Sequence, residues 1–150
     1  MNKVICSGYF NPLHKGHLDM FMMAKSIANG KNSCNNWFTW VIVNNDKQVK
    51  LKSGNFFLDE NTRLSIIDSL RCVDWTILSI DEDLTVCKTL QRIAKSGDIF
   101  VNCGDINSPE LVKEKDVCKE LGVQLMCLPL QKVNSSSSIL KEFLLNNSRC

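Results

Sequence analysis

Short apolar runs alternate with stretches of helical periodicity along the chain, and this alternation limits the possible folds more than any other feature. Strands are expected at residues 4–7, 37–43, 75–80, 99–102 and 124–128. Helices are expected at residues 17–28, 59–70, 84–95 and 108–122, with a last helix that starts within residues 135–138 and ends near Asn146. Strands that alternate with helices favour a parallel sheet with helices on both faces. The sequence therefore predicts an α/β fold with a five-stranded parallel sheet.

Length and composition narrow the functional classes. The 150 residues, 44% of them hydrophobic, suffice for one domain with its own core, and no linker or repeat divides residues 1–150. A formal net charge of +2 without a basic stripe argues against a nucleic-acid partner. No apolar segment approaches the roughly 20 residues that cross a bilayer, and no signal-peptide pattern opens the chain. A cytoplasmic protein without a membrane partner is expected.

The segment from Gly8 to His17 joins the first expected strand to the first helix and holds both histidines of the chain. Gly8 allows a tight turn, and Gly16 allows a ligand to approach the backbone closely. The unpaired N–H groups and the positive end of the dipole at a helix start attract phosphate. Imidazoles of His14 and His17 can donate hydrogen bonds to phosphate oxygens. The segment therefore predicts a site for phosphate chemistry, whereas zinc is not favoured, because no third ligand has suitable spacing.

Other polar groups also follow expected strands. Residues 44–58 are predicted to form a long loop, from which Lys50 or Lys52 can reach a phosphate. Arg63 lies in the first turn of the next helix, where a cation opposes the dipole and needs a ligand or an acid to hold it. Because ligands of such folds bind beyond the carboxyl ends of the strands, these groups can converge on one edge of the sheet.

A run of serines precedes the last expected helix. The hydroxyl groups of Ser135, Ser136 and Ser137, together with free N–H groups at the helix start, can hold the outer phosphates of a nucleotide. Capping of the helix by a single serine is the simpler alternative. Gly104 and Asp105 follow the fourth strand and complete the set of candidate site residues.

Gly8-x-Phe10-Asn11-x-x-His14-x-Gly16-His17 resembles the G-x-F-[DN]-x-x-H-x-G-H signature of the cytidylyltransferase-like nucleotidyltransferases. Residues 44–54 are similar to the lysine loop of that family, in which Lys52 precedes the turn at Gly54, and residues 60–63 are similar to its E-x-R helix start. Residues 101–105 resemble its V-x-G-G-D segment, and residues 134–140 resemble the start of its last helix. The resemblance spans nearly the whole chain and implies a single Rossmann-like domain, as in proteins related to glycerol-phosphate cytidylyltransferase and heptose-phosphate adenylyltransferase.

The resemblance implies transfer of CMP or AMP from CTP or ATP to a small phosphorylated acceptor, with release of pyrophosphate. The acceptor can be a glycerol, sugar or alcohol phosphate. Catalytic roles are implied for His14, His17 and Lys52, and contacts with the substrate phosphate for Lys50 and Arg63. The implied nucleotide contacts are Gly8, Tyr9, Phe10, Asn11, Gly16, Gly104, Asp105, Ser135, Ser136 and Ser137. Mg²⁺ is expected to enter mainly with the triphosphate, and a homodimer is implied.

Some positions depart from the family pattern. Asn11 stands where many relatives carry Asp and offers a metal only a neutral oxygen. Cys103 and Ile106 replace a glycine and an arginine. These departures keep a non-catalytic nucleotide-binding regulatory module open as the alternative function. A dinucleotide-dependent oxidoreductase is not expected, because no G-x-G-x-x-G follows the first strand.

Overall fold

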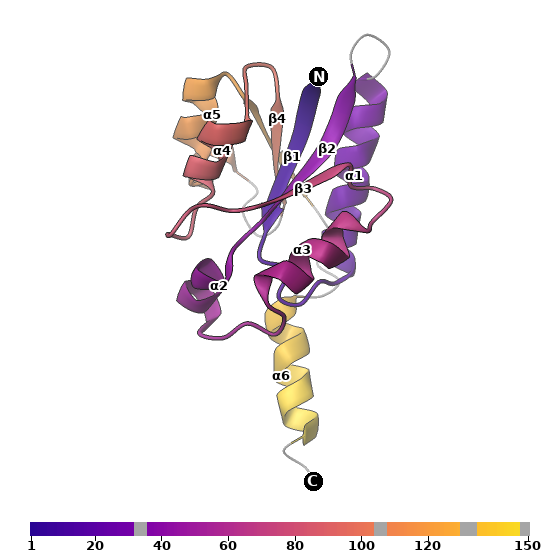
Figure 1. Ribbon diagram of the computed structural model, residues 1–150, viewed down its shortest axis with the longest axis vertical. Helices are drawn as coiled ribbons and strands as arrows, with labels where there is room; N and C mark the ends of the chain where they lie inside the picture. Colours follow the sequence, from indigo (N-terminus) through magenta and orange to yellow (C-terminus); the bar gives the residue numbers. More distant parts are fainter. Residues whose placement is uncertain (32–35, 104–107, 130–134, 148–150) are drawn as a thin grey trace.

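The computed structural model describes residues 1–31, 36–103, 108–129 and 135–147 (Figure 1). One parallel sheet has the strand order β3-β2-β1-β4-β5. Its strands are β1 (Asn2–Gly8), β2 (Trp37–Val43), β3 (Trp75–Leu78), β4 (Ile99–Cys103) and β5 (Gln124–Leu128). The helices of the described ranges are α1 (Lys15–Lys31), α2 (Asp46–Ser53), α3 (Glu60–Asp68), α4 (Cys87–Ile93), α5 (Lys115–Leu121) and α6 (Ser136–Asn147), with a short 3₁₀ helix, η1 (Pro109–Leu111). The α/β, Rossmann-like fold expected from the sequence is confirmed.

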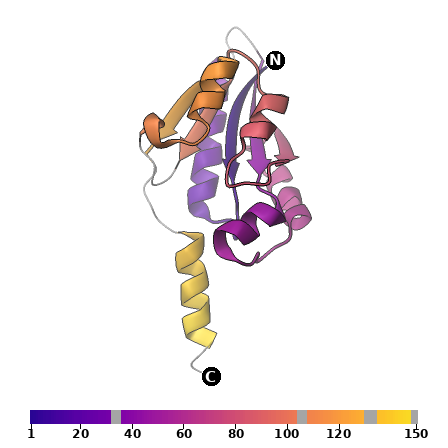
Figure 2. The same cartoon turned by 90° about the vertical axis from the view of Figure 1, so that its left-hand side faces the viewer.

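Helices cover both faces of the sheet (Figures 1 and 2). On one face, Val4 and Cys6 of β1 pack in a cluster with Phe21 of α1. On the other, Ile5 packs in a cluster with Leu90 of α4. Because β1 is buried on both faces, its side chains read as a continuous apolar run rather than an alternating one. This central strand carries the segment from Gly8 to His17 to the carboxyl edge of the sheet.

The prediction of a continuous loop over residues 44–58 is wrong, since α2 occupies residues Asp46–Ser53. Asn45 caps this helix: its side chain accepts the backbone N–H of Gln48, and the Gln48 side chain accepts the backbone N–H of Asn45. This reciprocal pair is a capping box, a helix-start signal that the polar character of the segment hides.

Several other boundaries differ from expectation: β1 is longer than predicted, α1 begins two residues earlier, and α3 and β3 are shorter. Three helices differ in ways that matter for the fold. Helix α1 continues through Gly30, which does not take the positive φ typical of a glycine that ends a helix. The helix expected over residues 108–122 is split into η1 and α5, because Val112 between them has extended backbone angles. Helix α4 covers only Cys87–Ile93 of the range 84–95, which leaves residues 84–86 as irregular chain at the edge of the sheet.

Helix α6 extends away from the body of the molecule (Figures 1 and 2). Its start lies beside the turn between β1 and α1, where the Ser136 hydroxyl donates a hydrogen bond to the Pro12 carbonyl at 3.0 Å. Among the described ranges, no helix combines the length and the apolar character needed to span a bilayer.

Candidate active site

A cavity of about 390 Å³ opens beyond the carboxyl ends of β1, β2 and β4. Its lining includes many of the residues singled out from the sequence: Gly8, Tyr9, Phe10, Asn11, His17, Lys52, Ser136 and Ser137. Gly104 and Asp105 lie outside the described residues. His14, Gly16, Lys50, Arg63 and Ser135 do not contribute to the lining. Segments far apart in the sequence therefore meet at one edge of the sheet.

The turn after β1 is shaped by packing between Gly8 and Phe10. The positive φ of the turn, 51°, belongs to Phe10 and not to Gly8. A Cβ atom at Gly8 would lie 2.7 Å from the Phe10 ring, so the glycine is needed for space rather than for an unusual backbone angle. The Phe10 ring, 1% exposed, in turn packs edge-on against His17, with 4.9 Å between ring centroids.

The two imidazoles are stacked, with ring centroids 3.8 Å apart. The backbone N–H of His14 donates to Nδ1 of His17, and the backbone N–H of Gly16 donates to Nδ1 of His14, both at 3.2 Å. A ring nitrogen that accepts a hydrogen bond carries no proton, so the proton of each neutral ring is on Nε2. Each imidazole therefore keeps an Nε2–H group as a donor for a ligand.

Burial lowers the pKa of both histidines. For His17, burial and the neighbouring charges of His14 and Lys52 lower the pKa to about 3. For His14, burial alone lowers the pKa. A neutral imidazole at pH 7 contributes an oriented hydrogen-bond donor rather than a full positive charge.

Helix α2 separates the two candidate lysines. The Lys52 ammonium lies over the Tyr9 ring, 4.0 Å from its centroid, and lines the cavity. Desolvation, and then the charge of Lys113, lowers the Lys52 pKa. Lys50 lies over Phe56 instead, 5.4 Å from the ring centroid. Residues two apart on a helix do not share a face, so the helix directs Lys52 into the cavity and Lys50 away from it.

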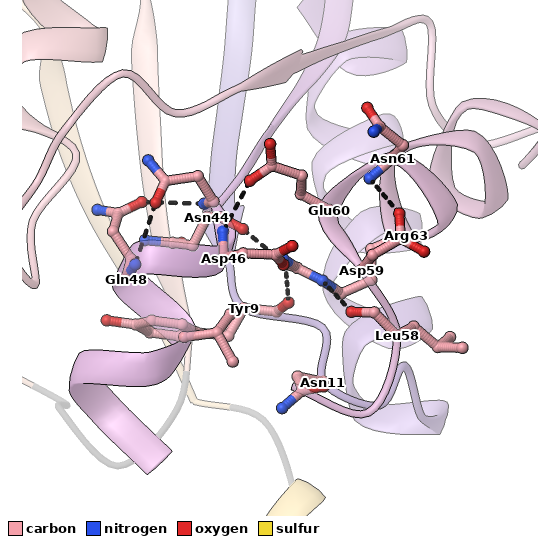
Figure 3. A network of polar contacts seen from close by, with 12 residues as sticks. Tyr9, Asn11, Asn44, Asp46, Gln48, Leu58, Asp59, Glu60, Asn61 and Arg63 are labelled. Carbon is pink, nitrogen blue, oxygen red and sulfur yellow. Dashed lines mark hydrogen bonds and ion pairs between the residues drawn. The ribbon is translucent and has the colours of Figure 1, made fainter. Parts of the chain in front are cut away.

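Arg63 is enclosed in the protein, with 1% of its surface exposed. Its guanidinium donates to three backbone carbonyls and one carboxylate (Figure 3): Leu58 at 3.0 Å, Tyr9 at 2.7 Å, Asn44 at 2.6 Å and Asp46 at 2.7 Å. These contacts join the β1–α1 turn, the end of β2 and the start of α3. The structure thus gives Arg63 an acid and three carbonyls as partners, in place of the substrate phosphate expected from the resemblance.

The Asn11 side chain, 5% exposed, is occupied within the protein. Its amide nitrogen donates to the Asn55 carbonyl at 3.3 Å, and its oxygen accepts the backbone N–H of Phe57. Over the part of the chain that the structure describes, no group of three or more His, Cys, Asp or Glu residues could hold a metal ion. The two contacts of Asn11 engage its side-chain amide, including the oxygen that the sequence offered to a metal.

The sequence reasoning missed one wall of the cavity, formed by Leu84, Thr85 and Val86 and here called the 84–86 wall. Gln48, 0% exposed, holds this wall by donating to the carbonyls of Asp83 and Thr85, each at 2.7 Å. The sequence signal that could have identified Gln48 is the capping-box pattern of α2, in which Gln48 follows Asn45 by three residues.

On its other side, the 84–86 wall is held by the segment that joins η1 to α5. The Glu114 carboxylate accepts the backbone N–H of Val86 at 3.0 Å, and Lys113 and Glu114 both line the cavity. The expectation of one continuous helix over residues 108–122 concealed this contribution, because only the break at Val112 brings the segment to the cavity.

A parallel sheet with β1 at its centre, and a cavity lined with donors where β1 gives way to α1, define a protein of the α/β nucleotide-binding class. Comparison with known families makes the class specific. Residues 5–143 match the model of the cytidylyltransferase-like family, and the chain belongs to that family. The assignment to these nucleotidyltransferases made from the Gly8–His17 signature is confirmed.

Curated relatives and a solved structure agree with this assignment. The chain is 31% identical over 147 residues to the bifunctional protein HldE of Blochmanniella floridana, covering 95% of this chain and 28% of HldE. It is 28% identical over 144 residues to the FAD synthase of Korarchaeum cryptofilum, covering 95% and 91%. Against the FAD synthase of Methanocorpusculum labreanum, the match is 32% over 84 residues and spans 54% of that protein. The lipopolysaccharide core biosynthesis protein from Thermoplasma volcanium GSS1 superposes with a TM-score of 0.67 at 25% identity, covering 89% of this chain and 99% of that one.

Proposed function

We propose that this chain transfers a nucleoside monophosphate, AMP or CMP, from its triphosphate to a small phosphorylated acceptor and releases pyrophosphate. The observation that carries the proposal is the meeting of His17, Lys52 and the start of α6 around one cavity. Two of the relatives described above are FAD synthases. Because FAD contains an AMP unit, ATP is the donor to test first.

In the proposed reaction, an oxygen of the acceptor phosphate forms a bond to the α-phosphorus. The bond from that phosphorus to the bridging oxygen breaks, and its electron pair leaves on pyrophosphate. A phosphate nucleophile is already ionised at pH 7, so no general base is needed. Catalysis is then a matter of positioning the reactants and stabilising the charge that develops on the phosphoryl oxygens.

The chain supplies this stabilisation from two sides. The Nε2–H groups of His14 and His17 donate to oxygens of the transferring phosphate, and the Lys52 ammonium neutralises its charge. The start of α6, from Ser135 to Ser137, holds the outer phosphates through its N–H groups and the Ser137 hydroxyl. The Ser135 hydroxyl caps the helix by accepting the Ser138 N–H at 3.1 Å, and the Ser136 hydroxyl donates to the Pro12 carbonyl. The absence of a side chain at Gly16 lets the nucleotide lie close to the turn, whereas Gly8, which lines the cavity, makes room for the Phe10 ring.

Several further assignments belong to the same proposal. Mg²⁺ enters with the triphosphate, consistent with the occupied side chain of Asn11. Tyr9, Phe10, Gly104 and Asp105 contribute to the nucleotide site. Residues 1–150 act as one domain, and the family resemblance implies a homodimer, which light scattering after size-exclusion chromatography tests against the 17.0 kDa chain.

The test is pyrophosphate release from each of the four triphosphates with a panel of glycerol, sugar and flavin phosphates. Replacement of His17 by Ala is expected to lower kcat at least about a hundredfold, as for the loss of one donor that stabilises a transition state. Lys119→Ala, on the exposed surface of α5, is the matched control and should turn over normally.

Normal turnover by the His17→Ala variant would contradict the mechanism. Binding of a triphosphate without turnover across the whole panel would instead support the non-catalytic regulatory module. A structural observation in favour of that alternative is Asn11, which lines the cavity but whose side-chain amide is hydrogen-bonded to the 55–57 segment.

A further inference from the structure

Lys113 is a cation of the cavity that neither the signature nor the resemblance assigns a role. It lines the same cavity as His17 and Lys52 but comes from the connection between η1 and α5. In the described part of the chain, neither Lys52 nor Lys113 has a hydrogen-bond or ion-pair partner, although Lys52 rests on the Tyr9 ring. The Asp83 carboxylate is near Lys113, since hydrogen bonds from Thr85 and, to a smaller extent, the charge of Lys113 lower the Asp83 pKa. Two lysines without a hydrogen-bond or close ion-pair partner beside one cavity point to an anionic ligand.

The backbone on either side of Lys113 is anchored. Val112 is buried, and the Glu114 carbonyl accepts the N–H of Cys118 at 2.9 Å in the first turn of α5. The Glu114 carboxylate binds the Val86 N–H at 3.0 Å. These contacts fix the point from which Lys113 extends and place it next to the 84–86 wall.

The donor groups of the cavity come from three segments of the chain. His14 stacks on His17 at 3.8 Å, and His17, Lys52 and Lys113 line the cavity together. Lys52 extends from α2, 4.0 Å from the centroid of the Tyr9 ring, and Lys113 extends from the connection between η1 and α5. The two lysines therefore reach one cavity from separate elements.

The cavity holds more donors than the nucleotide alone requires. In the proposed reaction, the histidines face the transferring phosphate and the start of α6 faces the outer phosphates. Lys52 and Lys113 share the cavity with the 84–86 wall, where Leu84 and Val86 offer apolar surface. A phosphate dianion between two ammonium groups would be neutralised there.

We propose that Lys52 and Lys113 together bind the phosphate of the acceptor, a phosphomonoester whose organic part lies against Leu84 and Val86. The assignment of this phosphate to the acceptor rests on the proposed function. The existence of a phosphate subsite at Lys113 does not rest on the proposed function, because the subsite follows from the placement of the two lysines beside one cavity.

The test measures binding of methyl phosphate to the full chain by ³¹P NMR titration. Lys113→Met is expected to weaken binding about tenfold, the effect of losing one charge-assisted hydrogen bond. Lys113→Arg, which keeps the charge, should stay within about threefold of the wild type. Lys119→Met, an exposed lysine of α5 away from the cavity, is the control and should bind as the wild type does. Thermal unfolding of each variant verifies that the fold is intact.

A second titration, with α,β-methylene-ATP at saturation, separates the acceptor from the nucleotide. Continued binding of methyl phosphate that depends on Lys113 supports the proposal. Complete displacement overturns it, because Lys113 would then serve the triphosphate. Equal binding by the wild type and Lys113→Met, or no binding by the wild type, also overturns it. If no acceptor yields pyrophosphate but binding that depends on Lys113 persists, the proposed function fails and the phosphate subsite remains.

Discussion

At the scale of single residues, the chemistry of the site depends on how the surroundings change the pKa values and the hydrogen bonding of ordinary side chains. Histidine side chains ordinarily titrate near neutrality. Burial lowers the pKa of both His14 and His17, which are stacked on each other, so both are uncharged at pH 7. Their Nδ1 atoms are occupied by backbone N–H groups, which leaves the Nε2–H groups as the donors of the two rings. The histidines therefore act as fixed donors, and the charge of the site comes from lysine.

The depressed pKa of His17 predicts an acid-dependent loss of stability. Its pKa lies near 3 in the folded state and near 6.5 in the unfolded chain, so the unfolded state binds the extra proton between these values. Stability is fully present above about pH 6.5 and falls toward pH 3, by on the order of 1 kcal/mol per pH unit. Urea unfolding at pH 7 and pH 4.5 should show a smaller loss for His17→Gln than for the wild type. An equal loss would show that His17 does not change its proton binding on folding.

The close approach of Gly8 to Phe10 predicts a second effect. In Gly8→Ala, the new Cβ would lie 2.7 Å from a ring that is itself buried in the core. Overpacking of this kind costs about 1–3 kcal/mol, and the shift of Phe10 would move His17 and lower turnover.

Gly30→Ala is the matched control for this substitution. Nothing lies within 4 Å of a Cβ at Gly30, which sits inside α1. This change should stabilise the protein by about 0.5–1 kcal/mol in thermal unfolding. A Gly8→Ala protein as stable and as active as the wild type would contradict the packing argument.

At the scale of elements, α2 connects two parts of the site. Its first turn is closed by the capping box of Asn45 and Gln48, its last turn carries Lys52, and its buried face holds the 84–86 wall. A displacement of this one helix would change the position of a phosphate-binding cation and of a cavity wall together. The short helix is thus a structural part of the site although it contains few apolar residues.

Removal of the Gln48 side chain should therefore affect both stability and substrate binding. Gln48→Ala removes two hydrogen bonds, to the carbonyls of Asp83 and Thr85, at a net cost of about 0.5–1.5 kcal/mol each. Because the 84–86 wall is released, the KM of the acceptor should rise more than the KM of the triphosphate. Gln91→Ala, at an exposed position of α4, should leave both parameters and the urea midpoint unchanged. Parallel increases of the two KM values would argue against a specific role in positioning this wall.

At the scale of the whole molecule, the fold gathers hydrogen-bond donors and lysine charges that the overall charge conceals. The net charge is only +2, yet His17 of α1, Lys52 of α2 and Lys113 of the η1–α5 connection line one cavity, together with the carboxylate of Glu114. The strand order makes this possible, because the carboxyl ends of β1, β2 and β4 are neighbours. The local field of the site, rather than the field of the whole surface, attracts the anionic substrates.

The repulsion between the Lys52 and Lys113 ammonium groups predicts that the alkaline limb of the pH–activity profile shifts when Lys113 is replaced. Desolvation, and then the charge of Lys113, holds the Lys52 pKa below its ordinary value, so Lys52 loses its proton at a lower pH than a free lysine. Activity that needs this charge is present below the lowered pKa and is lost as the pH rises through it. In Lys113→Met the repulsion is removed, and the alkaline limb of kcat/KM should move to higher pH. An unchanged limb would show that the two ammonium groups do not interact.

The sequence predicts the fold better than it predicts the role of each site residue. Alternating apolar runs specify the strands because β1 and its neighbours are buried on both faces, a property visible in the residues themselves. The convergence of His17, Lys52 and the α6 serines follows from the rule for parallel sheets. The placement of Arg63 could not be predicted, because its partners are backbone carbonyls brought together only in three dimensions. Lys113 was hidden for a similar reason, since the break between η1 and α5 carries no strong local signal.

The manner in which the 84–86 wall is attached bears on how substrate preference can evolve. Gln48 binds main-chain oxygens at positions 83 and 85, and Glu114 binds a main-chain N–H at position 86. The side chain of Leu84 takes no part in these attachments. Under the proposed function, a lineage can therefore exchange this residue and alter which acceptor fits the cavity, while the histidines and lysines of the site keep their positions.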